Sequence, residues 1–151
     1  MAPVNARQRL RSERGAELVE FALILPLLLF IILGLVDFGF LFQRFEVVTN
    51  AAREGARMAV LPGYVNADVT ARVQNYFTTG GVATTTGNPS VSVTNVTIPT
   101  GGGGPILPGK RVQVTYASPY LFIGPIAGWF GGTFTSANLT AVAVMRDELA
   151  P

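Results

Sequence analysis

A carboxylate stands close to the start of the most apolar stretch of the sequence. Glu20 is followed by Phe21, and from there the chain carries no charge as far as Val36. If this stretch is a membrane helix, an isolated carboxylate about one turn into it costs about 3 kcal/mol. Glu20 therefore needs either a cation as its partner or a position among the lipid headgroups beside Arg14.

The residues before Glu20 indicate where such a cation could come from. The arginine-rich beginning of the chain ends in R-G-A-E-L-V-E-F, with Gly15 five residues before Glu20. This pattern resembles the cleavage signal of type IV prepilins, in which a glycine ends the leader, an acid stands fifth in the mature chain and a hydrophobic helix follows. The resemblance implies that a prepilin peptidase cuts between Gly15 and Ala16. On the alternative interpretation, Gly15 is only a flexible residue before a helix.

Cleavage would also supply the missing cation. The new ammonium group of Ala16 could pair with Glu20 in the same chain or in a neighbouring one. In a filament such a pair of charges would set the stagger between subunits, because buried ion pairs specify register better than they add stability.

A second motif, A-A-R-E-G-A-R, lies beyond the apolar stretch. It consists of Ala51, Ala52, Arg53, Glu54, Gly55, Ala56 and Arg57. At this distance past an E-F-A-L-I-L-P helix, the motif resembles the TadE-like family of the tight-adherence (Flp) pilus system. The resemblance extends over about residues 14–57, and V-M-R-D-E at 144–148 is a weaker match to the way many TadE-like proteins end. It implies a role in pilus assembly, surface attachment and export.

The composition excludes several classes of site. The 151 residues include no Cys and no His, which excludes disulfides, metal sites built on these side chains, and Ser-His-Asp or Cys-His nucleophiles. The net charge of +2 is too small and too dispersed for a nucleic-acid surface. Residues 104–111 have part of the spacing of a phosphate-binding loop, but Arg111 replaces the Ser or Thr that binds magnesium. We therefore expect no enzyme, and no nucleotide, cofactor or metal.

The apolar stretch has the length of a membrane span. As a helix of about 1.5 Å per residue, Phe21 to Phe42 would measure about 33 Å, against about 30 Å for the hydrocarbon core. Pro26 removes one helix hydrogen bond and should kink this helix. The alternatives are a buried helix in a soluble core, which the rest of the chain is too small to surround, and a Sec signal, for which the run ends in a poor cleavage site. Asp37 lies either at the outer headgroup boundary or against a partner helix.

The charges on either side of this span predict its orientation. Residues 1–15 contain four arginines and one glutamate, so the positive-inside rule keeps the N-terminus in the cytoplasm. We expect a single-pass protein of the bacterial cytoplasmic membrane with its C-terminal part outside, where it either stays or enters a surface pilus. The expected partners are the lipid bilayer and, from the resemblance, a prepilin peptidase, other pilins and pilus-assembly membrane proteins.

The helix is predicted to continue beyond the bilayer. From Gln43 to Leu61 the pattern is amphipathic with an apolar side of Ala, Gly and Val, and Pro62-Gly63 is a stop signal. A helix over residues 16–61 would measure about 65–70 Å. Its small side chains permit the close approach of another helix or sheet, although packing within the outer domain would explain the same residues.

The remaining residues, 62–151, predict a small extracytoplasmic α+β domain. A second helix runs from Asn66 to Phe77, with Asn66 or Asp68 as its cap. Alternation with a period of two predicts strands at 90–98, at 111–116 and within 133–145, and hence a short antiparallel sheet. Residues 120–134 hold the only Trp. They are predicted as a short helix or loop on the sheet, or as an aromatic patch facing a partner or a membrane surface.

Three regions result: a basic leader at 1–15, a transmembrane and extended helix at 16–61, and the outer domain at 62–151. The resemblance implies a minor pilin-like or pseudopilin-like subunit, processed by a prepilin peptidase. The alternative function is an uncleaved, single-span envelope scaffold or binding protein, which would be indifferent to the change Gly15→Ala.

Overall fold

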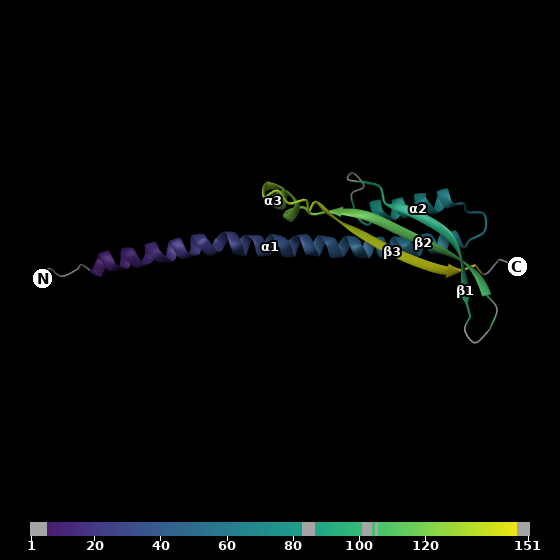
Figure 1. Cartoon of the computed structure of the whole chain (residues 1–151), viewed down its shortest axis with the longest axis horizontal. Helices are drawn as coiled ribbons and strands as arrows, with labels where there is room; N and C mark the ends of the chain where they lie inside the picture. The colour runs from purple at the N-terminus through teal and green to yellow at the C-terminus, as the bar shows by residue number, and fades with distance from the viewer. Residues whose placement is uncertain (1–5, 83–86, 101–103, 105, 148–151) are drawn as a thin grey trace.

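The computed structural model describes residues 6–82, 87–100, 104 and 106–147, and of residues 6–14 it describes the backbone alone. The first five residues of the predicted leader and Glu148 of the C-terminal motif lie outside the described residues. The elements follow the order α1 (Ala6–Ala59), α2 (Asn66–Thr79), β1 (Ser90–Pro99), β2 (Ile106–Pro119), α3 (Ile123–Trp129) and β3 (Ser136–Arg146) (Figure 1). This arrangement confirms the predicted α+β class, with a long first helix, a second helix and a short antiparallel sheet.

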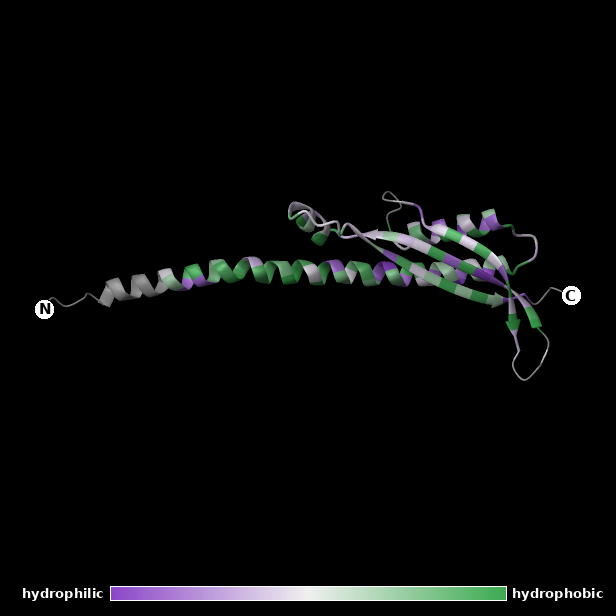
Figure 2. Cartoon of the chain, in the orientation of Figure 1, coloured by the Kyte–Doolittle hydropathy of each residue, from purple (hydrophilic) through white to green (hydrophobic). Residues whose placement is uncertain are grey.

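Helix α1 is one unbroken helix of 54 residues. It begins at Ala6, ten residues before the predicted start at Ala16, because the residues between them are mostly good helix formers with no proline. It ends at Ala59, shortly before Pro62 and Gly63, whose φ of +85° suits glycine. Figure 2 shows the apolar residues of α1 gathered in its N-terminal half, which extends beyond the rest of the molecule.

This projecting half of α1 is long and apolar enough to cross a membrane. The most apolar part of it is wholly unburied within the chain. Residues 15–59 would measure about 67 Å as a helix, about twice the hydrocarbon thickness. One half of α1 can therefore lie in lipid, while the other half packs on the outer domain.

The three strands form an antiparallel sheet in the order β1-β2-β3. Val112 of the central strand lies opposite Val93 of β1 and Ala143 of β3. Strand β2 is longer than the predicted segment 111–116, because its first residue, Ile106, already pairs with Pro99 at the end of β1. Alternate residues of β2 are buried from Val112 onward, so one face of the sheet supplies the core.

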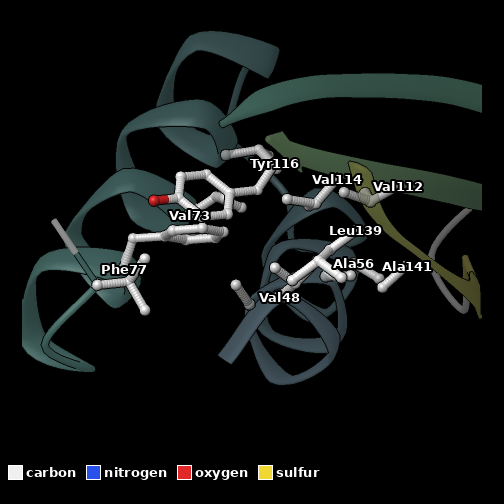
Figure 3. Close-up of a cluster of buried hydrophobic side chains, with 13 residues drawn as sticks. Val48, Ala56, Val73, Phe77, Val112, Val114, Tyr116, Leu139 and Ala141 are labelled. Carbon is white, nitrogen blue, oxygen red and sulfur yellow. The ribbon is translucent and has the colours of Figure 1, made fainter. Parts of the chain in front are cut away.

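Helices α1 and α2 cover that buried face of the sheet (Figure 3). The ring of Phe77 on α2 meets the ring of Tyr116 on β2 edge to face, with centroids 5.3 Å apart. The buried core residues are Val48, Ala51, Ala52 and Ala56 of α1, Val69, Val73 and Phe77 of α2, Val82 just after α2, Val112, Val114 and Tyr116 of β2, and Leu139 and Ala141 of β3. Helix α1 is thus both the projecting rod and one wall of the core.

Segment 120–134 forms a short helix, α3, and two flanking turns. Helix α3 lies beside α1 beyond the end of the sheet (Figure 1), so the predicted packing on the sheet is wrong in its location. The seven residues of α3 contain Pro125 and two glycines, a composition that keeps the helix short.

Gly55 marks the point where α1, α2 and β2 come closest. A Cβ atom built at Gly55 would lie 3.0 Å from a methyl group of Val73 and 3.2 Å from one of Val112. Both valines are fully buried, so they have little room to move. A larger residue at this position must separate the helices from the sheet.

We predict that Gly55→Val lowers the free energy of unfolding of the outer domain by about 1–3 kcal/mol, the usual cost of overpacking a core. Thermal unfolding of the detergent-solubilised full chain, followed by near-ultraviolet circular dichroism, measures the loss. Gly39→Val is the matched control, because a Cβ at Gly39 on the same helix meets nothing within 4 Å. Equal unfolding of the two variants would contradict the close packing at Gly55.

Candidate functional site

Gly15 lies in the exposed, projecting part of α1. A Cβ atom at this position would meet nothing within 4 Å, so packing within the chain does not require glycine here. Glycine in a helix interior costs about 1 kcal/mol relative to alanine, so Gly15 weakens the helix locally. Local unwinding would present the Gly15–Ala16 bond in the extended form that a peptidase needs.

Glu20 and Phe21 lie on the same exposed part of α1, and the ring of Phe21 is 58% exposed. Glu20 makes no hydrogen bond or ion pair with any side chain that the structure describes. Residues four apart on a helix share one face, so Ala16 stands one turn below Glu20. An ammonium group at Ala16 would lie within reach of this carboxylate.

Pro26 lies inside α1, which continues through it as one helix. Its ring nitrogen cannot donate a hydrogen bond to the carbonyl of Ala22. Figure 1 shows a gently curved helix without a sharp break, so the predicted kink amounts to no more than a gentle bend.

The motif at 51–57 has a buried side and an exposed side. Ala51, Ala52 and Ala56 are at most 1% exposed, and they face the chain's own sheet and α2 together with Gly55. The small residues that could have met a partner helix thus pack within the domain. Arg53 is exposed on the other side of the helix.

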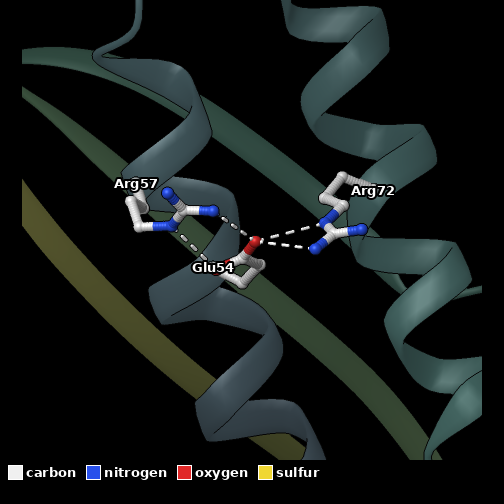
Figure 4. A network of polar contacts seen from close by, with 3 residues as sticks. All are labelled: Glu54, Arg57 and Arg72. Atoms are coloured by element: carbon white, nitrogen blue, oxygen red, sulfur yellow. Dashed lines mark hydrogen bonds and ion pairs between the residues drawn. The ribbon is translucent and has the colours of Figure 1, made fainter.

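Glu54 joins α1 to α2 through two arginines (Figure 4). Its carboxylate accepts hydrogen bonds from the Arg57 guanidinium at 3.0 and 2.9 Å and from the Arg72 guanidinium at 3.2 and 2.9 Å. This part of α1 packs on the outer domain, beyond the apolar half of the helix. The hydrogen bonds from Arg57, and then those from Arg72, lower the pKa of Glu54 from 4.5 to about 2.

The comparisons with known proteins bear on this same part of α1. Residues 15–57 match the family model described as TadE-like protein. Over this segment the chain is similar to TadE-like proteins. The match runs from the glycine of the predicted cleavage signal to the last arginine of the second motif, and it confirms the resemblance predicted from the sequence. No curated protein and no solved structure matches the chain.

Two polar residues within the TadE-like segment have contacts that the sequence did not reveal. Asp37 is 3% exposed. Its Oδ1 atom accepts hydrogen bonds from the backbone N–H groups of Leu121 at 2.8 Å and Phe122 at 3.2 Å. Its Oδ2 atom accepts them from Phe122 at 3.0 Å and Ile123 at 2.7 Å. Asp37 therefore holds the beginning of α3 in the same chain.

Arg44 holds the preceding residues in a similar way. Its Nη1 atom donates hydrogen bonds to Ser118 Oγ at 3.0 Å and to the carbonyl oxygen of Pro119 at 2.6 Å. Asp37 and Arg44 are seven residues apart, a spacing that places both on one face of a helix. The sequence thus indicates that the two side chains share a face, but it does not show which segment they bind.

None of these contacts assembles a reactive centre. Among the residues that the structure describes, no group of three or more His, Cys, Asp or Glu side chains could hold a metal ion. The TadE-like segment instead holds these residues at fixed levels along one helix. Gly15 and Glu20 lie in its projecting part, Asp37 and Arg44 lie midway, and residues 51–57 lie in the core.

The pKa of Glu54 predicts how stability of the outer domain depends on pH. A carboxyl whose pKa is lower in the folded state stabilises that state above its unfolded pKa of about 4.5, and this contribution is lost as the pH falls toward 2. We predict that Glu54→Gln destabilises the domain by about 1 kcal/mol at pH 7, and that the difference from the wild type disappears near pH 2.

Thermal unfolding of the two proteins between pH 7 and pH 2 measures this effect. Glu46→Gln is the control, because Glu46 is an exposed acid on the same helix. A difference between Glu54→Gln and the wild type that persists unchanged at pH 2 would contradict the ion-pair origin of the effect.

Proposed function

We propose that this TadE-like protein is a minor pilin-like or pseudopilin-like subunit of a tight-adherence (Flp, type IVb-like) pilus assembly system. In this proposal a prepilin peptidase cuts the precursor between Gly15 and Ala16. The family match supports involvement in tight-adherence pilus assembly in general. The observation that carries the finer proposal is α1, whose projecting apolar half begins with Gly15 and Glu20 and whose other half is built into the domain core.

The apolar half of α1 needs a cover that the chain itself does not supply. Its large side chains are exposed all around the helix, for example Leu23 at 76%, Leu27 at 63% and Leu35 at 66%. A helix that is apolar on every side belongs in lipid or among other apolar helices. A pilin-like subunit meets both environments in turn, first the membrane and then the helices of neighbouring subunits.

The charge pair gives this proposal its mechanism. Cleavage after Gly15 creates an ammonium group one helical turn from Glu20, and this group or its counterpart in a neighbouring subunit neutralises the carboxylate. Because α1 continues without a break into the core, an axial position fixed at Glu20 also fixes the axial position of the outer domain. Register at one end of the helix thus becomes register of the whole subunit.

The proposed topology is a single pass with the N-terminus in the cytoplasm and the domain outside the bacterial cytoplasmic membrane. The arginines before Gly15 support this orientation. The proposed partners are the prepilin peptidase, other pilins and pilus-assembly membrane proteins. Their contact with the chain is structural, and we propose no enzymatic activity.

The first prediction concerns processing. Expression together with an active prepilin peptidase should give a mature chain that starts at Ala16, and Gly15→Ala should abolish this start. Intact mass and N-terminal sequencing of the purified chain measure both. Gly39→Ala is the matched control and should be cut normally, because Gly39 lies on the same helix far from the bond.

An intact N-terminus in the wild type, while the same peptidase cuts another substrate in the same cells, would contradict this processing. The chain would then fit the alternative function, an uncleaved single-span envelope scaffold or binding protein.

The second prediction separates assembly from processing. Glu20→Gln should leave cleavage and membrane insertion intact but reduce the amount of subunit that copurifies with pili or with the other pilus-assembly membrane proteins. A loss of about tenfold corresponds to about 1.4 kcal/mol of lost interaction. Glu17→Gln is the control, since it removes a neighbouring exposed acid that does not share a helix face with Ala16. Equal copurification of the two variants would contradict the role of Glu20 in register.

A further inference from the structure

We propose that the segment from Tyr120 to Phe134, called here the α3 segment, lies in the outer leaflet of the membrane that α1 crosses. The inference uses the membrane span of the proposed function, but it does not depend on cleavage at Gly15 or on assembly into a pilus. The ligand is the lipid bilayer itself, at the level where acyl chains meet headgroups.

The α3 segment is attached firmly to the membrane half of α1. Asp37 accepts hydrogen bonds from three successive backbone N–H groups at the beginning of the segment, and Arg44 holds the two residues that precede it. A Cβ at Gly34 would stand 3.8 Å from Ile123 Cδ1, so α3 contacts α1 even closer to its N-terminus. The segment therefore stays at a fixed level along α1.

That level lies inside or at the edge of the bilayer. At about 1.5 Å per residue, Asp37 is about 24 Å beyond Phe21 along the helix, and Gly34 is about 20 Å beyond it. A hydrocarbon core about 30 Å thick that began at Phe21 would end near Leu41. Even if the core began at Ala16, it would end next to Asp37. In both placements the contact with α3 is no further out than the boundary between acyl chains and headgroups.

The contact also explains how an acid can occupy this depth. A carboxylate near the outer boundary is costly unless polar groups satisfy it, and the free N–H groups at a helix start are costly in lipid for the same reason. Asp37 and the first residues of the α3 segment satisfy each other. The described hydrogen bonds thus leave an outward surface on α3 that is mainly apolar.

The exposed side chains of the segment have the chemistry of a membrane interface. Trp129 is 88% exposed, Phe130 85% and Phe134 72%. No charged residue occurs between Arg111 and Arg146, so no charged side chain in this part of the chain opposes burial in lipid. Trp and other aromatic residues gather where acyl chains meet headgroups, and α3, with seven residues, is far too short to span the bilayer.

Lipid fits this surface better than a partner protein does, because the surface is continuous with the exposed apolar flank of α1. Wherever lipid covers the exposed side chains of Leu35, Val36, Phe38 and Phe40 on α1, it also reaches the side chains of α3. The outer domain then has two contacts with the membrane, α1 and the α3 segment. Together they fix the rotation of the domain about α1, and extraction of the subunit from the membrane must remove both.

The single tryptophan makes the inference directly measurable. Trp129 is the only Trp in the chain, so the fluorescence of the full-length protein in nanodiscs reports on α3 alone. We expect blue-shifted emission, quenching by lipids brominated on the acyl chains that is strongest for bromines near the headgroup, and iodide quenching at least about twofold weaker than for a water-exposed indole.

Two relocated tryptophans calibrate the measurement. In Trp129→Phe/Phe30→Trp the indole lies in the middle of the predicted span, and deep bromines should quench it most. In Trp129→Phe/Tyr64→Trp it lies beyond the C-terminal end of α1, in the connection to α2, at a position where the tyrosine is 49% exposed, and iodide should quench it freely. If the Phe30→Trp probe failed to respond to deep bromines, the membrane span itself would be wrong, and the inference would fall with it.

Red-shifted, iodide-accessible emission from Trp129, with the Phe30→Trp probe quenched by lipid, would overturn the inference alone. Blue-shifted emission that brominated lipids do not quench would also overturn it, since a second copy or another protein would then cover the patch. Asp37→Asn keeps the size of the side chain but removes its charge and one strong acceptor. It should broaden the depth distribution of Trp129 and raise its iodide quenching. The same Asp37→Asn change in the Trp129→Phe/Tyr64→Trp protein should leave the iodide quenching of that probe unchanged. An unaltered depth of Trp129 would contradict the positioning role of Asp37.

Discussion

The rest of this structure depends on one constraint: a single helix, α1, both projects from the molecule and forms part of its core. Residues 15–32 of α1 are exposed and have no cover within the chain, whereas Val48, Ala51, Ala52 and Ala56 further along the helix are buried against the sheet and α2. Because the helix does not break between the halves, the outer domain cannot move along or around the projecting apolar half independently. The small residues Ala51, Ala52, Gly55 and Ala56 allow the sheet and α2 to approach the helix closely there.

Polar residues of α1 bind the outer domain at three levels along the helix. Asp37 binds the start of the α3 segment, Arg44 binds the end of β2, and Glu54 binds Arg72 of α2. Each contact joins the helix to a different part of the outer domain. In a chain with so few charged residues, these contacts position the domain on the helix, and the proposed function assigns Glu20 to partners outside the chain.

The sequence allowed much of this fold to be predicted because its signals are local. The uncharged run, the Pro62-Gly63 stop and the alternating strands depend on neighbouring residues, and they gave the right elements in the right order. The destination of Asp37 was not predictable, since a lone acid in an apolar stretch indicates a need for donors and not which of them will fold back to meet it. The early start of α1 was missed for a different reason: the start at Ala16 followed from the expected cleavage after Gly15, whereas in the uncut chain the helix continues back to Ala6. The side chains at 51–57 fitted both a partner surface and a core, and only the tertiary structure distinguishes the two.

The continuity of α1 across the membrane surface can be tested by hydrogen–deuterium exchange of the full-length protein in nanodiscs. The decisive amides are those of residues 38–47, which link the lipid-covered half to the core-packed half. A rigid shared helix predicts that they exchange as slowly as those of residues 48–58, with no fast-exchanging break between them. Rapid exchange confined to residues 38–47 would mean that the outer domain is hinged to a separate membrane anchor, and register could not pass from Glu20 to the domain.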